Sequence, residues 1–135
     1  MKYLVDTDWV VDYLRGREPR VSILNSLAED GLAISLVTFG EIYEGIYSGH
    51  DPKGQEQGFL RFLRGVRVLS LNRATMQRFA RTRGSLRRQG QMIGDPDVLI
   101  ASTALHFGLT LITGNKRHFD RIPDLIQFDA TAARR

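Results

Sequence analysis

The chain has 135 residues, of which 42% are apolar and 25% charged, with a formal net charge of +4. These values predict a globular protein with one domain, residues 1–135, and exclude disulfides, thiolate metal sites and thiol nucleophiles because cysteine is absent. No apolar run reaches the ~20 residues of a membrane-spanning helix, and no signal peptide precedes the first apolar run. We therefore expect a cytoplasmic protein that does not meet a membrane.

The first part of the chain alternates short apolar runs with segments of helical periodicity. Residues 2–5 predict a buried strand, and residues 9–14 carry the apolar face of a helix that ends before Gly16. A second helix is predicted over residues 21–28, and a second strand over residues 32–37.

Two helices are predicted after the second strand. Thr38 and Glu41 match a capping box, in which the first side chain caps the helix and the second bonds back to the cap N–H. This helix should run to about Tyr47, and Asp51 should begin the next one. The predicted buried face of that next helix consists of Phe59, Leu60, Phe62 and Leu63.

The remaining elements continue the alternation. Residues 66–71 predict a third strand, after which Asn72 can cap a long arginine-rich helix that ends near Gly90. Asp95 is expected to cap the following helix, with Pro96 at its first position. The last predicted strands are residues 109–113 and 125–128.

Strands that alternate with helices predict an α/β fold, in which helices flank a central parallel sheet of four to five strands. Ligands of such sheets bind beyond the carboxyl ends of the strands. Asp6 follows the first strand, Glu41 follows the second, and Asn115 follows a later one. We therefore expect these three side chains to meet at one edge of the sheet.

Acidic side chains dominate this predicted edge, since Asp97 at the beginning of a helix is expected to join Asp6 and Glu41. Carboxylates gathered in a pocket repel each other, and a hard divalent cation removes that repulsion. Such an ion also favours the cleavage of phosphate esters. The predicted catalytic residues are Asp6, Glu41, Asp97 and Asn115. The predicted metal ligands are Asp6, Glu41 and Asp97, with Asp95, Asn115 and Asp120 as further candidates.

Each of these residues also has a purely structural interpretation. Asp6 can cap a helix, although Thr7 and Asp8 beside it could serve equally well. Glu41 can belong to the capping box, and Asn115 suits a turn. The three histidines of the chain show no zinc-binding spacing, which argues against a zinc enzyme.

The middle of the chain is strongly basic, because residues 59–94 contain nine arginines and no acidic residue. Arginine binds phosphate oxygens through two parallel hydrogen bonds, so this block predicts contact with a nucleic acid. A solvated helix face or a surface for an acidic protein would explain it as well. The candidate RNA contacts are Arg73, Arg78, Arg81, Arg87 and Arg88.

Four motifs carry a resemblance to a known family. Residues 3–7 read Tyr-Leu-Val-Asp-Thr, and residues 37–45 join a Thr, an acid and a Gly after a strand. Residues 93–101 read Ile-Gly-Asp-Pro-Asp-Val-Leu-Ile-Ala, and residues 108–123 contain Thr-Gly-Asn and then His-Phe. Over nearly its whole length the chain resembles PIN-domain proteins, most closely the VapC-type ribonuclease toxins of type II toxin–antitoxin systems.

The resemblance implies a three-layer PIN-like fold and an endoribonuclease that depends on Mg²⁺ or Mn²⁺. It further implies that Asp6, Glu41 and Asp97 form the shared metal-binding core, that a cognate antitoxin inhibits the enzyme, and that the chain forms homodimers. The family often has a fourth acid near the closing strand. Asn115 and His118 stand at the matching positions here, which leaves a second metal open.

Two other functions are compatible with the sequence. Asp6 and Asp8 resemble the Asp-x-Asp motif of haloacid-dehalogenase phosphohydrolases, in which Asp6 would be phosphorylated and Asp8 would act as acid and base. That enzyme would need a lysine beside the phosphate, and no lysine here stands in a convincing motif. Alternatively, a PIN-like domain without its fourth acid would be a non-catalytic module that binds RNA or protein.

Overall fold

The structure is a computed structural model that describes residues 1–133, so the last two residues of the predicted domain lie outside it. Within this range one sheet contains β1 (Tyr3–Val5), β2 (Leu32–Ser35), β3 (Val66–Leu69) and β4 (Thr110–Ile112). The helices are α1 (Thr7–Leu14), α2 (Arg20–Leu27), the 3-10 helix η1 (Ala28–Asp30), α3 (Leu36–Ser48), α4 (Pro52–Leu63), α5 (Arg73–Arg88), α6 (Asp95–Phe107), α7 (Lys116–Phe119) and α8 (Ala130–Ala133).

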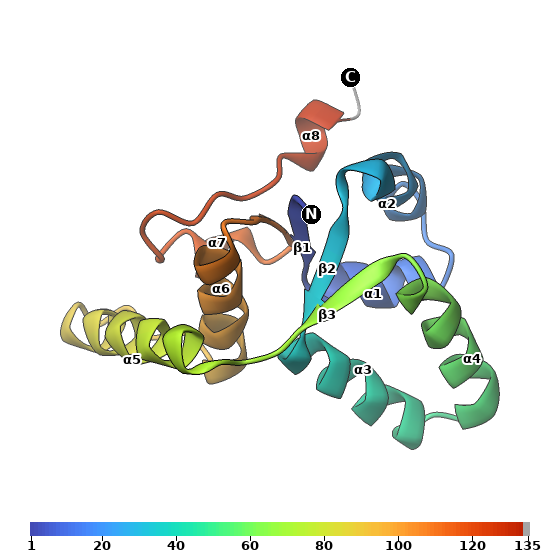
Figure 1. Ribbon diagram of the computed structural model, residues 1–135, viewed down its shortest axis with the longest axis horizontal. Coiled ribbons are helices and arrows are strands. Elements are labelled where there is room, and N and C mark those ends of the chain that lie inside the picture. The colour runs from blue at the N-terminus through green and yellow to red at the C-terminus, as the bar shows by residue number, and fades with distance from the viewer. Residues whose placement is uncertain (134–135) are drawn as a thin grey trace.

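The strands lie in the order β3-β2-β1-β4, and every pair is parallel. Helices cover both faces of the sheet, with α5 and α6 on one side and α1, α3 and α4 on the other (Figure 1). The predicted α/β fold with a central parallel sheet of four to five strands and flanking helices is therefore confirmed. Within residues 1–133 no helix is both long and apolar enough to cross a bilayer.

The side-chain alternation of β1 explains how one short strand serves two layers, because successive side chains point to opposite faces. Leu4 joins the core cluster that includes α6, whereas Tyr3 and Val5 join the cluster that includes α1 and α3. All three side chains are buried, as expected for a strand covered on both faces. Asp6 therefore follows directly on a strand that is buried on both faces.

Several element boundaries differ from those predicted. The second strand ends at Ser35, whose side chain accepts a 3.0 Å hydrogen bond from the N–H of Thr38 and caps α3. The capping box at Thr38 and Glu41 is therefore wrong, because the helix begins earlier, at Leu36. This shift moves Glu41 into the second turn of α3 and leaves its carboxylate available for other contacts.

Three further predictions need correction. Asp95 does not cap α6: the cap is Gly94, and the Asp95 side chain instead pairs with Arg83. Leu60 was expected in the core but is 50% exposed on the outer face of α4. Residues 125–128 form only an isolated bridge beside β4, although Leu111 exchanges backbone hydrogen bonds with this segment.

Candidate active site

Asp6 stands directly after β1 and is both the N-cap of α1 and a member of a polar cluster. Its Oδ1 accepts a 2.8 Å hydrogen bond from the N–H of Thr7, which satisfies an otherwise unpaired donor of the helix. Its Oδ2 accepts a 2.7 Å hydrogen bond from the hydroxyl of Thr113. The cap interpretation is thus correct, and it leaves room for a second role because the carboxylate borders a cleft.

Glu41 reaches the same region from α3. The hydroxyl of Thr7 donates a 2.6 Å hydrogen bond to Glu41 Oε1 and lies 3.0 Å from the hydroxyl of Thr38. This contact ties the first turn of α1 to α3, so the Glu41 carboxylate has a defined position although the residue is exposed.

Asp97 lies in the first turn of α6, where the partial positive charge of the helix N-terminus favours a carboxylate. Its Oδ2 is 3.0 Å from His118 Nδ1 and accepts a 3.4 Å contact from the amide of Asn115. The Asn115 amide and the His118 ring are themselves 2.8 Å apart. Asp97, Asn115 and His118 therefore form one connected group that joins α6 to α7.

These groups border an open cleft of about 500 Å³ at the carboxyl edge of the sheet. The cleft is lined by Asp6, Thr7, Asp8, Glu41, Asp97, Gly114 and Asn115. Four of these side chains are carboxylates, and no lysine, arginine or histidine is among them. The structure therefore brings together the four residues predicted as catalytic, although their roles in catalysis stay predictions.

Burial and the neighbouring negative charges both affect the pKa of Asp6, which is only 6% exposed. Burial, which disfavours the charged form, raises the pKa of Asp6 from its ordinary 3.8 to about 6. Hydrogen bonds from Thr113 and Thr7 lower this pKa, whereas the negative charges of Asp8 and Asp97 raise it. The folded chain thus holds a carboxylate that would be stabilised by a nearby positive charge.

Oxygen donors with excess negative charge suit a hard cation such as Mg²⁺ or Mn²⁺. Within residues 1–133 the acidic, histidine and cysteine side chains form no ready cage of three or more ligands for one ion. Mg²⁺ commonly binds through one or two carboxylates and keeps several waters, so such a cage is not required. The donor set of the cleft therefore fits a hydrated divalent cation held by few protein oxygens.

Two of the further metal candidates lie outside the cleft. Asp95 is exposed and forms a 2.8 Å ion pair with Arg83. Asp120 is also exposed, and its carboxylate accepts a hydrogen bond from Gln127. Neither carboxylate borders the cleft, and the identity of the metal ligands stays a prediction.

The five candidate RNA contacts all lie on α5, which packs against α6 (Figure 1). None of them lines the cleft. Four are exposed and Arg78 is half-buried. Their contact with RNA stays a prediction.

The sequence analysis missed several residues of the site. Thr7 and Thr113 were not assigned a role there, yet their hydroxyls hold the Glu41 and Asp6 carboxylates. Asp8, predicted only as an alternative helix cap or as the acid and base of a haloacid dehalogenase, lines the cleft and accepts a hydrogen bond from the N–H of Gly114. A usable signal was the Thr-Gly after β4, because a glycine directly beyond a strand often marks a close approach of the backbone.

A second depression, of about 390 Å³, lies between α1, α3 and α4. We call it the α1–α3–α4 groove. Its apolar lining includes Val11, Leu14, Ile42 and Ile46, and its rim carries Arg15 and Arg61. Glu41 borders both this groove and the acidic cleft, so the two depressions are neighbours.

Comparison with known proteins supports one family. A family model described as PIN domain matches residues 3–125. The chain is 33% identical over 130 residues to Ribonuclease VapC2 of Rickettsia felis, covering 93% of this chain and 96% of that protein. It is 27% identical over 125 residues to the tRNA(fMet)-specific endonuclease VapC of Shigella flexneri, with 93% and 95% covered.

A solved structure is similar over nearly the same length. The crystal structure of VapBC2 from Rickettsia felis bound to a DNA fragment from their promoter superimposes with a TM-score of 0.88 at 27% identity. The match covers 95% of this chain and 98% of that chain.

Proposed function

Because this chain belongs to the PIN-domain family and matches its VapC ribonucleases, we propose that it is a metal-dependent endoribonuclease and the toxin of a type II toxin–antitoxin pair. The observation that carries the proposal is the cleft at the carboxyl edge of the sheet, lined by four carboxylates and no basic side chain. We also propose that the protein acts in the cytoplasm, where its proposed RNA substrate would be met.

Asp6 and Asp97 would hold Mg²⁺ or Mn²⁺, with Glu41 beside them at the exposed rim. When bound, such an ion activates water and stabilises negative charge on phosphoryl oxygens. The fit rests on the donor set, since carboxylate oxygens are preferred ligands of these ions. The raised pKa of Asp6 also supports it, because an unpaired carboxylate in this cleft is destabilised by burial and by its acidic neighbours.

The other polar groups of the site would fix the reacting geometry. Thr7 and Thr113 hold the Asp6 carboxylate from two sides, so its orientation does not depend on the substrate. Glu41, whose Oε1 is held by Thr7, would position the attacking water. The water oxygen would then bond to phosphorus and release a proton to solvent, while the bond from phosphorus to the leaving ribose oxygen breaks and that oxygen takes up a proton from solvent.

The test is cleavage of a mixed RNA substrate that includes total tRNA, with and without Mg²⁺ or Mn²⁺. We expect wild-type protein to cut only with metal, and Asp97→Asn to lose cutting while its circular dichroism and unfolding midpoint stay close to wild type. Asp95→Asn is the matched control, because Asp95 lies outside the cleft. An Asp97→Asn protein that cuts RNA at the wild-type rate would refute the proposed site.

The second part of the proposal is a protein partner. The chain is also similar to a toxin–antitoxin complex from Klebsiella pneumoniae, with a TM-score of 0.72 at 27% identity, and we propose that the cognate antitoxin of this chain occupies the α1–α3–α4 groove. Its apolar lining suits the apolar face of a helix. Since Glu41 borders both groove and cleft, a segment seated there can also reach the carboxylates. Leu14→Arg should weaken inhibition by the cognate antitoxin while cleavage persists.

Of the two alternative functions, one is excluded by the family of the chain and the other requires an experiment. The haloacid-dehalogenase interpretation is wrong, because the chain belongs to the PIN-domain family, and Asp8 is engaged by the N–H groups of Trp9 and Gly114. A non-catalytic RNA- or protein-binding module would be the conclusion if pure wild-type protein bound RNA without cutting it. Homodimer formation stays a prediction that sedimentation can test.

A further inference from the structure

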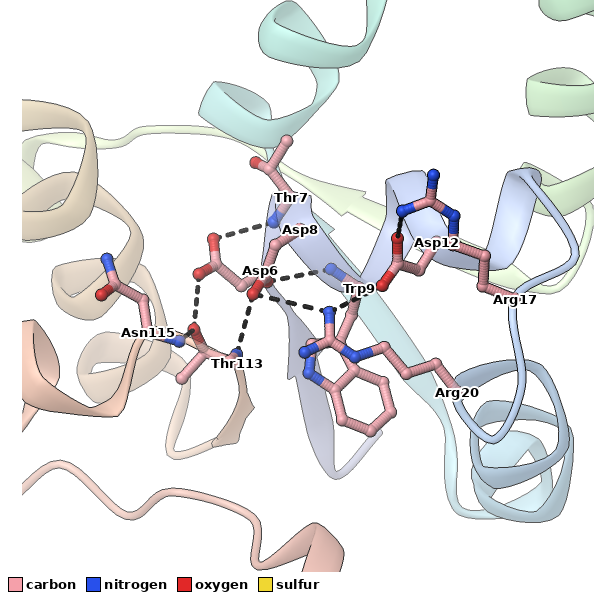
Figure 2. Close-up of polar contacts among 10 residues, drawn as sticks. Asp6, Thr7, Asp8, Trp9, Asp12, Arg17, Arg20, Thr113 and Asn115 are labelled. Carbon is pink, nitrogen blue, oxygen red and sulfur yellow. Dashed lines mark hydrogen bonds and ion pairs between the residues drawn. The ribbon is translucent and has the colours of Figure 1, made fainter.

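Asp8 is a carboxylate of the cleft whose oxygens are already engaged inside the protein. Its Oδ1 accepts a 2.9 Å hydrogen bond from the N–H of Trp9. Its Oδ2 accepts a 2.9 Å hydrogen bond from the N–H of Gly114 and lies 3.6 Å from the guanidinium of Arg20 (Figure 2). Asp8 therefore joins α1 to two distant parts of the chain, the turn after β4 and the beginning of α2.

Gly114 occupies the turn between two residues that contact the candidate metal ligands. Thr113 before it donates to Asp6, and Asn115 after it donates to Asp97. Any movement of the Gly114 backbone would shift both contacts. The hydrogen bond from Gly114 to Asp8 therefore helps to fix the positions of Thr113 beside Asp6 and of Asn115 beside Asp97.

The turn lies so close to Asp8 and Arg20 that a Cβ atom on Gly114 would displace the ends of these two side chains. A Cβ atom built on Gly114 would lie 2.6 Å from Asp8 Oδ2 and 2.5 Å from a guanidinium nitrogen of Arg20. Such distances are well below van der Waals contact. The close approach shows that the turn, the carboxylate and the guanidinium pack as one unit.

Arg20 itself is held on three sides. Its guanidinium lies 3.1 Å from Asp12, 3.6 Å from Asp8 and 4.7 Å from the ring centre of Trp9. Its side chain is 27% exposed, and Arg20 does not line the cleft. A planar guanidinium that stacks on an indole while pairing with two carboxylates has little freedom to move.

We propose that Arg20 and Asp8 form a positioning pair that holds the β4–α7 turn and thereby places Thr113 and Asn115 at the cleft. Arg20 neutralises Asp8 and fixes its rotamer, and Asp8 in turn fixes the N–H of Gly114. Without Arg20, Asp8 would face three other carboxylates uncompensated and would turn toward solvent. The consequence for cleavage rests on the proposed nuclease function, whereas the structural coupling does not.

The first measurement is hydrogen exchange of the Gly114 amide, followed by ¹H–¹⁵N NMR. We expect exchange at least about threefold faster in Arg20→Met, because the carboxylate that protects this N–H loses its anchor. In Arg20→Lys, which keeps the charge but not the planar guanidinium, the Gly114 exchange rate should lie between the rates of wild type and Arg20→Met. Arg17→Met is the matched control: Arg17 also pairs with Asp12, at 3.3 Å, but it is 60% exposed. Its Gly114 exchange should equal that of wild type.

The second measurement is a double-mutant cycle on RNA cleavage. We expect Arg20→Met and Asp8→Ala each to lower kcat about tenfold or more with little change in KM, since misplaced groups affect the reacting geometry. The double variant should be no slower than Asp8→Ala alone, because Arg20 acts through Asp8. All variants should keep the wild-type circular dichroism spectrum.

Either measurement can overturn the inference. Gly114 exchange in Arg20→Met equal to that in wild type contradicts the positioning pair, whether or not the protein cuts RNA. Independent effects that multiply in the double variant contradict it as well. If wild-type protein cuts no RNA, the proposed function fails, and the Gly114 exchange rates alone decide for or against the pair.

Discussion

The hydroxyl of Thr113 donates a 2.7 Å hydrogen bond to Oδ2 of Asp6, although 107 positions separate the two residues. The register of the sheet explains the contact. Val5 of β1 lies opposite Ile112 of β4, and Asp6 and Thr113 are the next residues after the two strands. The same hydroxyl accepts a 3.0 Å hydrogen bond from the N–H of Asn115. One side chain thus connects the buried acid to the loop that carries the candidate catalytic amide.

Replacing Thr113 with valine should impair both stability and activity. The change keeps the side-chain shape but removes the donor to Asp6 and the acceptor for Asn115, so we expect a loss of about 1–3 kcal/mol in the free energy of unfolding. Cleavage should fall about tenfold or more. Urea unfolding and RNA cleavage measure the two effects. Thr103→Val is the control, since buried Thr103 bonds only the carbonyl of Leu99 within α6; equal activity losses in both variants would contradict the prediction.

Asp6 should make the metal-free protein less stable as the pH rises. Its pKa is about 6 when folded, above its ordinary 3.8, so the folded state binds this proton more tightly than the unfolded state. The resulting stabilisation is complete below about pH 4 and is lost as the pH rises through 6. A shift of about 2 units corresponds to at most about 3 kcal/mol.

Asp6→Asn removes this titration while keeping the size of the side chain. We expect the variant to be more stable than wild type at pH 7.5 in EDTA, and this advantage to shrink at pH 4.5. Urea unfolding at the two pH values measures it. An identical pH dependence in wild type and Asp6→Asn would mean that Asp6 does not carry the effect.

Divalent cations should stabilise the folded protein at neutral pH. A ligand that binds only the folded state at 100 times its Kd adds about 2.7 kcal/mol to the free energy of unfolding. Mn²⁺ should therefore raise the Tm of wild-type protein at pH 7.5, and less so at pH 5, where protons compete for Asp6. The double variant Asp6→Asn/Asp97→Asn should show no rise, and a full rise in that variant would place the ion elsewhere.

The arginines of α5 should contribute to RNA binding rather than to chemistry. Arg87 and Arg88 are exposed in the last turn of α5. Replacing both with glutamine should raise KM with little change in kcat and lower the salt slope of RNA binding by about 1.4, at about 0.7 per lost phosphate contact with a single strand. Arg67→Gln is the control, because exposed Arg67 lies on β3. If the Arg87/Arg88 double variant and Arg67→Gln had the same KM, this part of α5 would be excluded from RNA contact.

Much of the fold could be predicted because it depends on local patterns. Apolar runs that alternate with helical periodicity identified the four strands and the helices between them, and Asn72 caps α5 as its position before an arginine-rich helix suggested. The convergence of Asp6, Glu41 and Asp97 could be anticipated too, since parallel strands all end at one edge of the sheet.

Boundaries failed where two local signals competed. Ser35 and Thr38 are both good caps, and the choice between them depends on where β2 stops pairing with β3, opposite Leu69. Likewise, Asp95 can cap a helix, but its carboxylate pairs with Arg83 on α5 instead. These partners lie on other elements of the fold, so a local sequence pattern does not reveal them.

Local sequence patterns are sufficient to predict the order of elements, the class of fold and the acidic character of the site, because backbone propensity and side-chain alternation act over a few residues. They do not predict which oxygens Thr7 and Thr113 hold, or that Asp8 joins Arg20 to Gly114. These contacts depend on strand register and helix packing between distant segments. Hydrogen bonds and ion pairs require distances of a few ångströms, which sequence spacing does not specify.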